Sequence, residues 1–420
     1  MVNDNLQALR VNSKRFRANF EALARIGSTS DGGVHRPALS DAHLKARAWF
    51  IKRIKEAGLH FRVDSAGNHS ALLRCGPADG STLLLGSHLD SVPEGGRFDG
   101  ALGVLAALEA LQVVRENNIS LPFHLEAIDF TDEEGTLVGL LGSAALAGKL
   151  STEALQDPRG GRDHLLDRLS KANLSQENLF NARREPVELA GYLELHIEQG
   201  KRLQRADADI GVVSSIVGIG SCRIIFEGRA DHAGTTPMED RLDAALGASS
   251  FTLAVREVTQ SEFPHCVANV GQIQLFPAAF NIVPGRAIVS LEFRAPDSNT
   301  LNNLETALLN HAQLTAEKYN LGLNTESLGK HPPSPMDAHF RETITQAAQS
   351  LKLKTIDLVS GAGHDAQSFA EVCPSGMVFV PSVSGASHSP REYTEWQDCL
   401  NGANVLLQVT LRLADLWMDG

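Results

Sequence analysis

Apolar residues in the first half of the chain form short continuous runs, separated by longer segments with helical spacing. Thr82–Gly86 is a short apolar run, as expected for a strand that is buried on both faces. Ala101–Arg115 predicts a buried helix, and Phe123–Thr131 and Gly191–His196 predict two further strands. This order of strands and helix indicates an α/β layer with a mostly parallel sheet, in which ligands gather at the carboxyl ends of the strands.

The middle of the chain has a different order of elements. The pattern predicts strand, helix, strand, strand, helix and strand at Gly211–Glu227, Arg241–Val258, Cys266–Phe276, Arg286–Arg294, Asn299–Tyr319 and Leu321–Leu328. This β-α-β-β-α-β order is that of a ferredoxin-like sandwich, which can fold as a unit. A proline-rich boundary at 332–335 follows, and the α/β pattern then returns. We therefore expect a first domain of residues 1–209 and 330–420, an inserted domain at 210–329, and a polar surface excursion at Arg159–Arg184.

Composition narrows the class of protein. The net charge of −12 and the aromatic content of 5% argue against a nucleic-acid partner. No apolar run reaches the length of a membrane span, and the N-terminus lacks an apolar signal core. Five scattered cysteines without a CxxC pair fit a reducing compartment. We expect a cytoplasmic globular enzyme or binding protein with no membrane partner.

The hexapeptide "FTDEEG" ends a predicted core strand with three consecutive acids, Asp132, Glu133 and Glu134. These side chains repel one another and would destabilise the fold if they were buried without cations. An exposed turn or the acidic first turn of a helix would also explain the hexapeptide when it is considered alone. The distribution of histidines elsewhere in the chain favours a functional explanation.

Histidines and further acids recur at the ends of other predicted strands, where glycine or serine lets the backbone turn. The set consists of His88, Asp90, Asp99, Glu133, Glu134, His196 and His388. Any one of these histidines alone is more often a structural residue than a ligand. Together, imidazole and carboxylate groups without thiolate suit zinc, manganese or cobalt. About five ligands suit two ions, which a carboxylate can bridge.

The motifs "GSHLDSVPEGGRFDG", "TDEEG", "LELHIEQG" and "SGASHSPRE" resemble those of the dinuclear-metal amidohydrolases of the M20 peptidase group. The resemblance is strongest to the hydantoinase/carbamoylase branch, which includes N-carbamoyl-L-amino-acid hydrolases, allantoate amidohydrolases and β-ureidopropionases. It extends from "DGGVHRPALS" to "ASHSPREYT", which is nearly the whole chain. It implies that the inserted domain is a lid and dimerisation domain, and that the protein is a homodimer.

The resemblance also implies how the metal ligands divide. His88 and His196 would hold one divalent ion, and Glu134 and His388 would hold the other. Asp99 would bridge the two ions.

Further residues take supporting roles in the same family. Glu133 would be the general base that moves a proton from the attacking water to the leaving nitrogen. Asp90 would orient His88 through the other ring nitrogen of that histidine. In this family the bridging aspartate is followed by a cis peptide, which implies a cis bond between Asp99 and Gly100.

Substrate binding is implied in the same way. The branch binds the substrate carboxylate and the ureido group at positions that correspond here to Gln199, His232, Asn281, Arg294, Gly363 and His364. Arg294 is the expected partner of the carboxylate, because a guanidinium group pairs bidentately. His232 often reaches the active site of the other subunit in this family, where it helps to stabilise an oxyanion.

The expected activity is hydrolysis of the carbamoyl C–N bond of an N-carbamoyl-L-amino acid, which releases ammonia, carbon dioxide and the amino acid. Allantoate and N-carbamoyl-β-alanine remain alternative substrates, and "GAGHDAQ" looks more like the allantoate enzymes. The segment "EEGTLVGLLGS" is shorter than its counterpart in the branch and lacks Arg-Phe, so the pocket wall beside Glu133 should differ. More distant alternatives are an aminoacylase or dipeptidase of the wider group and a non-catalytic metal-dependent binding protein.

Overall fold

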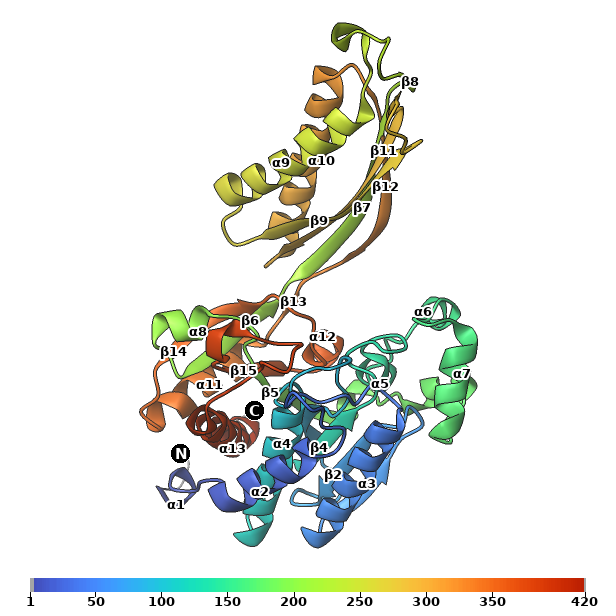
Figure 1. Ribbon diagram of the computed structural model, residues 1–420. Helices are drawn as coiled ribbons and strands as arrows, with labels where there is room; N and C mark the ends of the chain where they lie inside the picture. Colours follow the sequence, from blue (N-terminus) through green and yellow to red (C-terminus); the bar gives the residue numbers. More distant parts are fainter. Residues whose placement is uncertain (1–3, 419–420) are drawn as a thin grey trace. The chain divides into compact units, whose positions relative to one another are not determined.

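The computed structural model describes residues 4–418, which divide into two compact units (Figure 1). One unit comprises Met1–Ser214 and Met336–Gly420, and the other comprises Ser215–Pro335. The inserted segment was expected at 210–329. The single strand expected over Gly211–Glu227 is in fact two strands that belong to different sheets, β6 (Ile210–Ile216) and β7 (Gly218–Glu227). The chain therefore leaves the first sheet several residues later than the apolar pattern indicated.

The first unit is built on a nine-stranded sheet, within the residues that the structure describes. Its order is β1 (His60–Val63), β2 (His69–Leu73), β4 (His124–Phe130), β3 (Thr82–His88), β5 (Leu189–Ile197), β15 (Ser375–Val380), β6 and β13 (Ser334–Pro335), and β14 (Thr355–Ser360) pairs with β6. The central strands β4, β3, β5 and β15 run parallel, whereas β1 with β2, β2 with β4, and β6 with β15 and β13 pair antiparallel. The mostly parallel α/β sheet is thus confirmed, with antiparallel edges.

The described part of the first unit also contains helices. They are α1 (Asp4–Gln7), α2 (Ser13–Ala24), α3 (Asp41–Glu56), α4 (Ala101–Glu116), α5 (Leu141–Leu146), α6 (Thr152–Gln156), α7 (Arg162–Lys171), α8 (Arg202–Ala206), α11 (Ala338–Ser350), α12 (Ala366–Phe369) and α13 (Trp396–Met418), with short 3₁₀ turns η1 (Gln176–Ala182), η2 (Pro186–Glu188) and η4 (Val383–Gly385). Helix α4 is buried from Ala101 to Val114, as predicted, although Glu109 and Gln112 interrupt its apolar sequence. No helix in the described part of the chain is both long and apolar enough to cross a membrane.

The segment Arg159–Arg184, expected to be a polar surface excursion, is partly a small core. Leu165 and Leu169, four residues apart on α7, are buried together with Leu179. Two leucines at this spacing share one helical face, and that face packs although the rest of the helix is charged. The excursion prediction was therefore wrong for this face.

The second unit confirms the predicted β-α-β-β-α-β order. Strands β7, β9 (Val267–Phe276), β11 (Arg286–Ala295) and β12 (Gly322–His331) form an antiparallel sheet in the order β12-β7-β11-β9. Helices α9 (Ala244–Glu262) and α10 (Ser298–Lys318) pack on one face of it (Figure 1). A small two-stranded sheet, β8 (Asp231–His232) with β10 (Ile282–Val283), and the 3₁₀ turn η3 (Met238–Asp240) complete the unit.

Candidate metal centre

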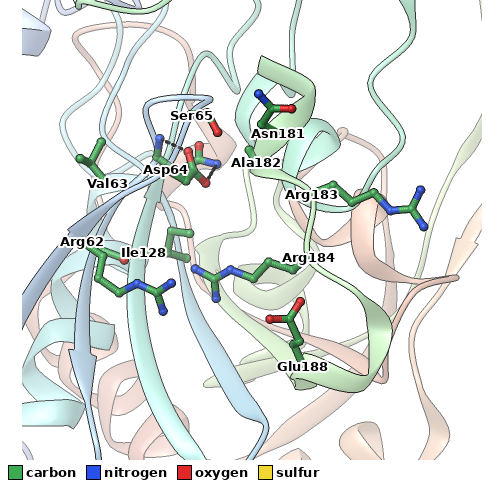
Figure 2. Close-up of a pocket in the computed structure, with 12 residues that line it drawn as sticks. Arg62, Val63, Asp64, Ser65, Ile128, Asn181, Ala182, Arg183, Arg184 and Glu188 are labelled. Carbon is green, nitrogen blue, oxygen red and sulfur yellow. Dashed lines mark hydrogen bonds between the residues drawn. The ribbon is translucent and has the colours of Figure 1, made fainter. Parts of the chain in front are cut away.

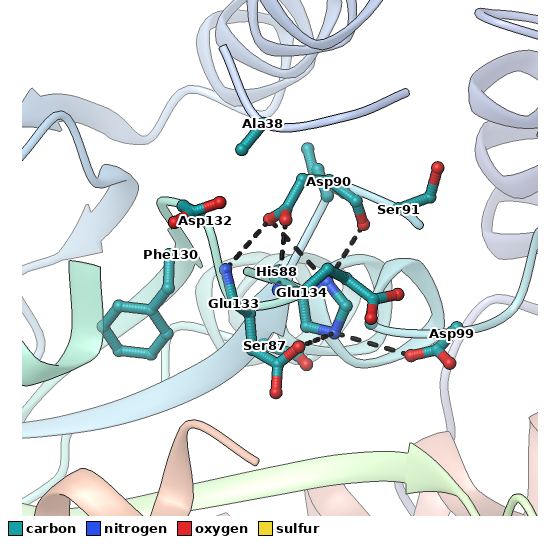
Figure 3. A network of polar contacts seen from close by, with 12 residues as sticks. Ala38, Ser87, His88, Asp90, Ser91, Asp99, Phe130, Asp132, Glu133 and Glu134 are labelled. Atoms are coloured by element: carbon teal, nitrogen blue, oxygen red, sulfur yellow. Dashed lines mark hydrogen bonds and ion pairs between the residues drawn. The ribbon is translucent and has the colours of Figure 1, made fainter. Parts of the chain in front are cut away.

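The carboxyl ends of three neighbouring parallel strands bring the predicted acids and histidines together. His88 is the last residue of β3 and pairs with Phe130, the last residue of β4. The acidic hexapeptide therefore continues directly beside His88 (Figure 3). His196 lies near the end of β5. A site at this edge is what the parallel order of the strands predicts.

Asp99 lies at the middle of two groups of metal-ligating atoms. Its Oδ1 is 3.5 Å from His88 Nε2 and 3.0 Å from His196 Nε2. Its Oδ2 is 3.5 Å from His388 Nε2, which is itself 3.4 Å from Glu134 Oε2. The two groups, His88, Asp99 and His196 on one side and Asp99, Glu134 and His388 on the other, share only Asp99.

The separations within each group fit the coordination shell of a small divalent ion. Two ligand atoms that each lie about 2.0–2.2 Å from a tetrahedral ion are about 3.3–3.6 Å apart. The spacings around Asp99, Glu134 and the three histidines are 3.0–3.5 Å. The carboxylate and imidazole donors therefore suit divalent ions in chemistry and, approximately, in spacing.

The ring nitrogens of the two buried histidines are held in a ligating orientation. Nδ1 of His88 is 3.0 Å from the main-chain carbonyl of Asp90, and Nδ1 of His196 is 2.9 Å from that of Ile197. Each Nδ1 is therefore assigned as the protonated nitrogen, which leaves the Nε2 lone pair directed at the carboxylates. His88 Nε2 is buried without a hydrogen-bond partner in the described structure. A lone pair that faces carboxylate oxygens is repelled unless a cation lies between them.

The pKa values of the clustered side chains also favour a cation at this site. Burial and the charge of Asp99 raise the pKa of Glu134 to about 8, and burial with the nearby Glu134 raises the pKa of Glu133 well above its usual value. Burial disfavours protonation of His88, but Glu133 and Asp99 outweigh this and raise its pKa well above the usual value. The raised pKa values of Glu133, Glu134 and His88 all reflect the negative charge gathered in this buried site, which added positive charge would offset.

The turn after β4 explains how two adjacent glutamates project into the site. Asp132 has a positive φ of 58°, and its carboxylate accepts hydrogen bonds from the N–H groups of Leu137, Val138 and Gly139. The hydrogen bonds of the Asp132 carboxylate therefore stabilise its own loop and do not involve the clustered histidines and acids. Burial and the neighbouring Asp90 raise its pKa to about 7.

Asp90 differs from its expected role. The Asp90 carboxylate is 3.9 Å from Nδ1 of His88, and the main-chain carbonyl of Asp90 is the closer partner. The carboxylate instead accepts from the N–H groups of Glu133, at 3.4 Å, and Glu134, at 3.2 Å. Asp90 thus ties the loop after β3 to the acidic turn after β4.

The cis peptide expected between Asp99 and Gly100 is absent, and that prediction was wrong. Phe276–Pro277 is the cis bond among the described residues. Gly100 turns the chain instead, with φ 61° and ψ −49°, and the Ala101 N–H donates to the Asp99 carbonyl at 2.6 Å. This is a γ-turn. A Cβ on residue 100 would lie 2.5 Å from the His88 ring, so only glycine fits.

Sequence reasoning missed Glu392 and Ser387. The Glu392 carboxylate accepts from the N–H groups of Phe98, at 2.9 Å, and Asp99, at 3.1 Å. Ser387 Oγ donates to Glu392 at 2.9 Å and lies 3.1 Å from Asp99 Oδ2. The only local signal was that both residues flank His388 in "SGASHSPRE".

Three of the expected substrate residues lie in the first unit. Gln199 Nε2 donates to Asp99 Oδ2 at 2.7 Å and is 3.4 Å from His388 Nε2. His364 is buried against His196, with ring centroids 4.5 Å apart, and contacts the Ser360 hydroxyl at 2.9 Å. Burial and His196 lower the pKa of His364 well below its usual value, so the ring is neutral. Gly363 precedes it in the loop between β14 and α12.

The other three lie in the second unit and are divided between its two ends. His232 is exposed on β8 opposite Ile282, and the Asn281 carbonyl accepts from the Ala233 N–H at 2.9 Å. This small sheet adjoins the Arg286 end of β11, where Gly285 is bonded to Gly228. Arg294 is paired with Glu292 at 2.8 Å. It lies eight residues beyond Arg286 on β11, which is about 27 Å along the strand. The structure therefore does not bring Arg294 together with His232 and Asn281 within one unit.

Comparison with known proteins identifies the family. A sequence model of peptidase family M20/M25/M40 matches residues 84–412. An N-carbamoyl-L-amino acid amidohydrolase of Geobacillus stearothermophilus is 34% identical over 406 residues, which cover 96% of this chain and 99% of that protein. A ureidoglycolate hydrolase of Oryza sativa subsp. japonica is 31% identical, with 96% of this chain and 85% of that protein covered.

Solved structures agree with the sequence comparison. An amidase of the hydantoinase/carbamoylase family from Burkholderia multivorans superposes with a TM-score of 0.86 at 34% identity, covering 97% of this chain and 99% of that structure. The chain is therefore a metal-dependent hydrolase. It belongs to peptidase family M20/M25/M40, and within it to the hydantoinase/carbamoylase branch.

Proposed function

We propose that this chain is a two-metal amidohydrolase that cleaves the carbamoyl C–N bond of an N-carbamoyl-L-amino acid or a related ureido acid. The proposal of two ions rests on the position of Asp99, whose carboxylate oxygens face two separate groups of ligands. His88 and His196 would hold one ion, Glu134 and His388 the other, and Asp99 both. The ions would supply Lewis acidity at the scissile carbonyl, and zinc, manganese and cobalt all suit the donors.

Glu133 is the proposed general base. Its Oε2 lies 3.5 Å from His88 Nε2, yet Glu133 belongs to neither group of ligand atoms. Its carboxylate is therefore free to take a proton from the attacking water and deliver it to the leaving nitrogen, which departs as ammonia. The remaining carbamate then loses carbon dioxide and leaves the amino acid.

Basic groups beside the centre favour a substrate with a carboxylate. Gln199, which contacts Asp99, also lines a cavity of about 550 Å³ that includes Lys201, Arg202 and Arg205. Arg294 in the second unit offers a bidentate partner for the same class of group. The relatives named for N-carbamoyl-L-amino acids support the first choice of substrate, and the ureidoglycolate hydrolases support an allantoate-type alternative.

Ammonia release from a panel of ureido acids tests the proposed reaction. Protein reloaded with zinc, manganese or cobalt is incubated with N-carbamoyl-L-amino acids, N-carbamoyl-β-alanine, allantoate and ureidoglycolate, with N-acetyl amino acids and dipeptides as the comparison. We expect ammonia from at least one ureido acid and a far lower turnover of the ordinary amides. Rapid cleavage of dipeptides or N-acetyl amino acids, without ammonia from any ureido acid, would favour the aminoacylase alternative.

The separation of Arg294 from His232 leads to a prediction about subunits. A small ureido acid cannot span the roughly 27 Å along β11, so if both residues contact it they come from different chains. We propose a two-fold homodimer in which each chain lends His232 and Asn281 to the other's site. His232→Ala and Glu133→Gln, each nearly inactive alone, should then recover roughly a quarter of wild-type activity when mixed and allowed to exchange.

The quarter follows from counting sites. With equal amounts and random exchange, half of the dimers are mixed, and each mixed dimer has one intact site. Subunit exchange is verified with differently tagged chains, and a mixture of Glu133→Gln with Glu134→Gln serves as the control, because neither partner can then supply an intact metal-bearing unit. If tagged chains exchange and His232→Ala with Glu133→Gln stays inactive, His232 does not act across the dimer.

A further inference from the structure

The peptide groups of Leu89, between His88 and Asp90, are held from both sides by buried charged residues. The Leu89 N–H donates to Asp129 Oδ1 at 2.8 Å. The Leu89 carbonyl accepts from Arg36 Nε at 2.5 Å. Leu89, Arg36 and Asp129 are all almost completely buried. Because Leu89 is the residue between His88 and Asp90, these two bonds restrict how both of their side chains can be directed.

Asp129 is itself fixed by a second buried side chain. Arg47 of α3 donates from Nε to Asp129 Oδ2 at 2.8 Å, and both side chains are at most 2% exposed. Arg47 Nη2 also donates to Thr131 Oγ1 at 2.9 Å. Arg47 therefore holds the end of β4, the strand that leads directly to Glu133 and Glu134. The described hydrogen bonds and ion pairs of Asp129 and Arg47 involve none of the five proposed metal ligands.

Arg36 anchors the other side of the same loop. Its Nη1 donates to the carbonyls of Leu23, at 3.3 Å, and Ile26, at 3.1 Å, at the end of α2. Its main-chain N–H donates to Ser91 Oγ at 3.0 Å. Arg36 thus links the end of α2 to the loop that follows β3. Its described side-chain hydrogen bonds all go to main-chain carbonyls.

We propose that Asp129, fixed by Arg47, is a positioning residue that sets the direction of His88 through the Leu89 peptide and thereby tightens metal binding. This inference rests on the proposed metal-binding role of His88. An outer partner of this kind typically contributes 10–100-fold to metal affinity. It acts here through a main-chain N–H, whereas most such partners bond the ligating side chain directly.

The same strand provides a matched control. Glu126, three residues before Asp129 on β4, is equally buried and is paired bidentately with Arg184 at 2.7 and 2.8 Å. Strand alternation places Glu126 on the opposite face of the sheet from Asp129. Arg184 and Arg62 line a cavity of about 370 Å³ on that face (Figure 2). The described hydrogen bonds of Glu126, to Arg184 and Ser70, do not involve the loop between His88 and Asp90.

The test compares Asp129→Ala with Glu126→Ala in the full-length protein. Each is stripped of metal, and its affinity for zinc is measured by competition with a chromophoric chelator, alongside the unfolding temperature of the metal-free form. Both variants should unfold at lower temperature, because each leaves a buried arginine without its partner. Only Asp129→Ala should lose zinc affinity, by about 10–100-fold. If Asp129→Ala does not fold, Asp129→Asn is compared with Glu126→Gln, which preserves side-chain volume in both.

Two outcomes would overturn the positioning role. One is an unchanged zinc affinity after loss of the Asp129 carboxylate, and the other is an equal loss in the Glu126 variant, which would mean a general effect of destabilising the strand. Failure of wild-type protein to bind zinc, manganese or cobalt at all would instead overturn the proposed metal centre. The wild-type titration therefore separates failure of the inference from failure of the proposed function.

Discussion

Replacing Glu133 by glutamine should leave two metal ions bound to each chain and lower kcat by about 10²–10⁴-fold, the usual contribution of a positioned proton transfer. The amide keeps the size of the side chain but cannot accept the proton of the attacking water. Metal retention is expected because Glu133 is outside both groups of ligand atoms. Metal content by elemental analysis and turnover by ammonia release, measured on the same preparation, provide the two readouts.

Glu134→Gln is the matched control for this prediction, since it changes the adjacent residue in the same way. Glu134 Oε2 lies 3.4 Å from His388 Nε2, within the second group of ligands. An amide oxygen is a weaker ligand than a carboxylate, so this variant should lose metal before it loses any proton-transfer function. If Glu133→Gln lost its metal and Glu134→Gln kept both ions, the roles of the two glutamates would be reversed.

Where the sequence predicted the fold well, one strong pattern decided the local structure. The apolar run at Thr82 became β3 and the mostly apolar segment at Ala101 became α4, because an element that is buried on every side needs apolar residues at nearly every position. The pattern failed at Val217, where one apolar run spans two strands in different sheets. Periodicity describes which residues are buried, but it does not show which sheet buries them.

The candidate site could also be predicted from the sequence only in part. Histidines and acids at the ends of predicted strands could be found in the sequence, because parallel strands place their carboxyl ends at one edge. The residues that hold these side chains in place could not. Glu392 is 293 residues from Asp99, and Asp129 is 40 residues from Leu89, so no local spacing relates them. A charged residue within a core strand, such as Asp129 in "LEAIDF", was the available sign of a buried partner.

Removing the metal should abolish turnover, and restoring zinc, manganese or cobalt should recover it. The physical reason is the cluster itself: Glu133 and Glu134 lie beside Asp99 in a buried site, where burial and the neighbouring negative charges oppose the ionisation of both glutamates. Divalent cations offset that repulsion, so the metal-free protein should also be less stable. A ligand that binds only the folded state adds about 2.7 kcal/mol at a free concentration of 100 times its Kd.

Three measurements on one preparation, the first before chelation and the other two after it, check this prediction. Elemental analysis before chelation should give close to two divalent ions per chain. The unfolding temperature should then rise with added metal, and ammonia release should return over the same range of metal concentration. Magnesium is a suitable control, since it prefers oxygen ligands and near-octahedral geometry, whereas three of the five proposed ligands here are imidazoles. Full turnover by thoroughly metal-free protein would show that the acids and histidines around Asp99 serve some other purpose.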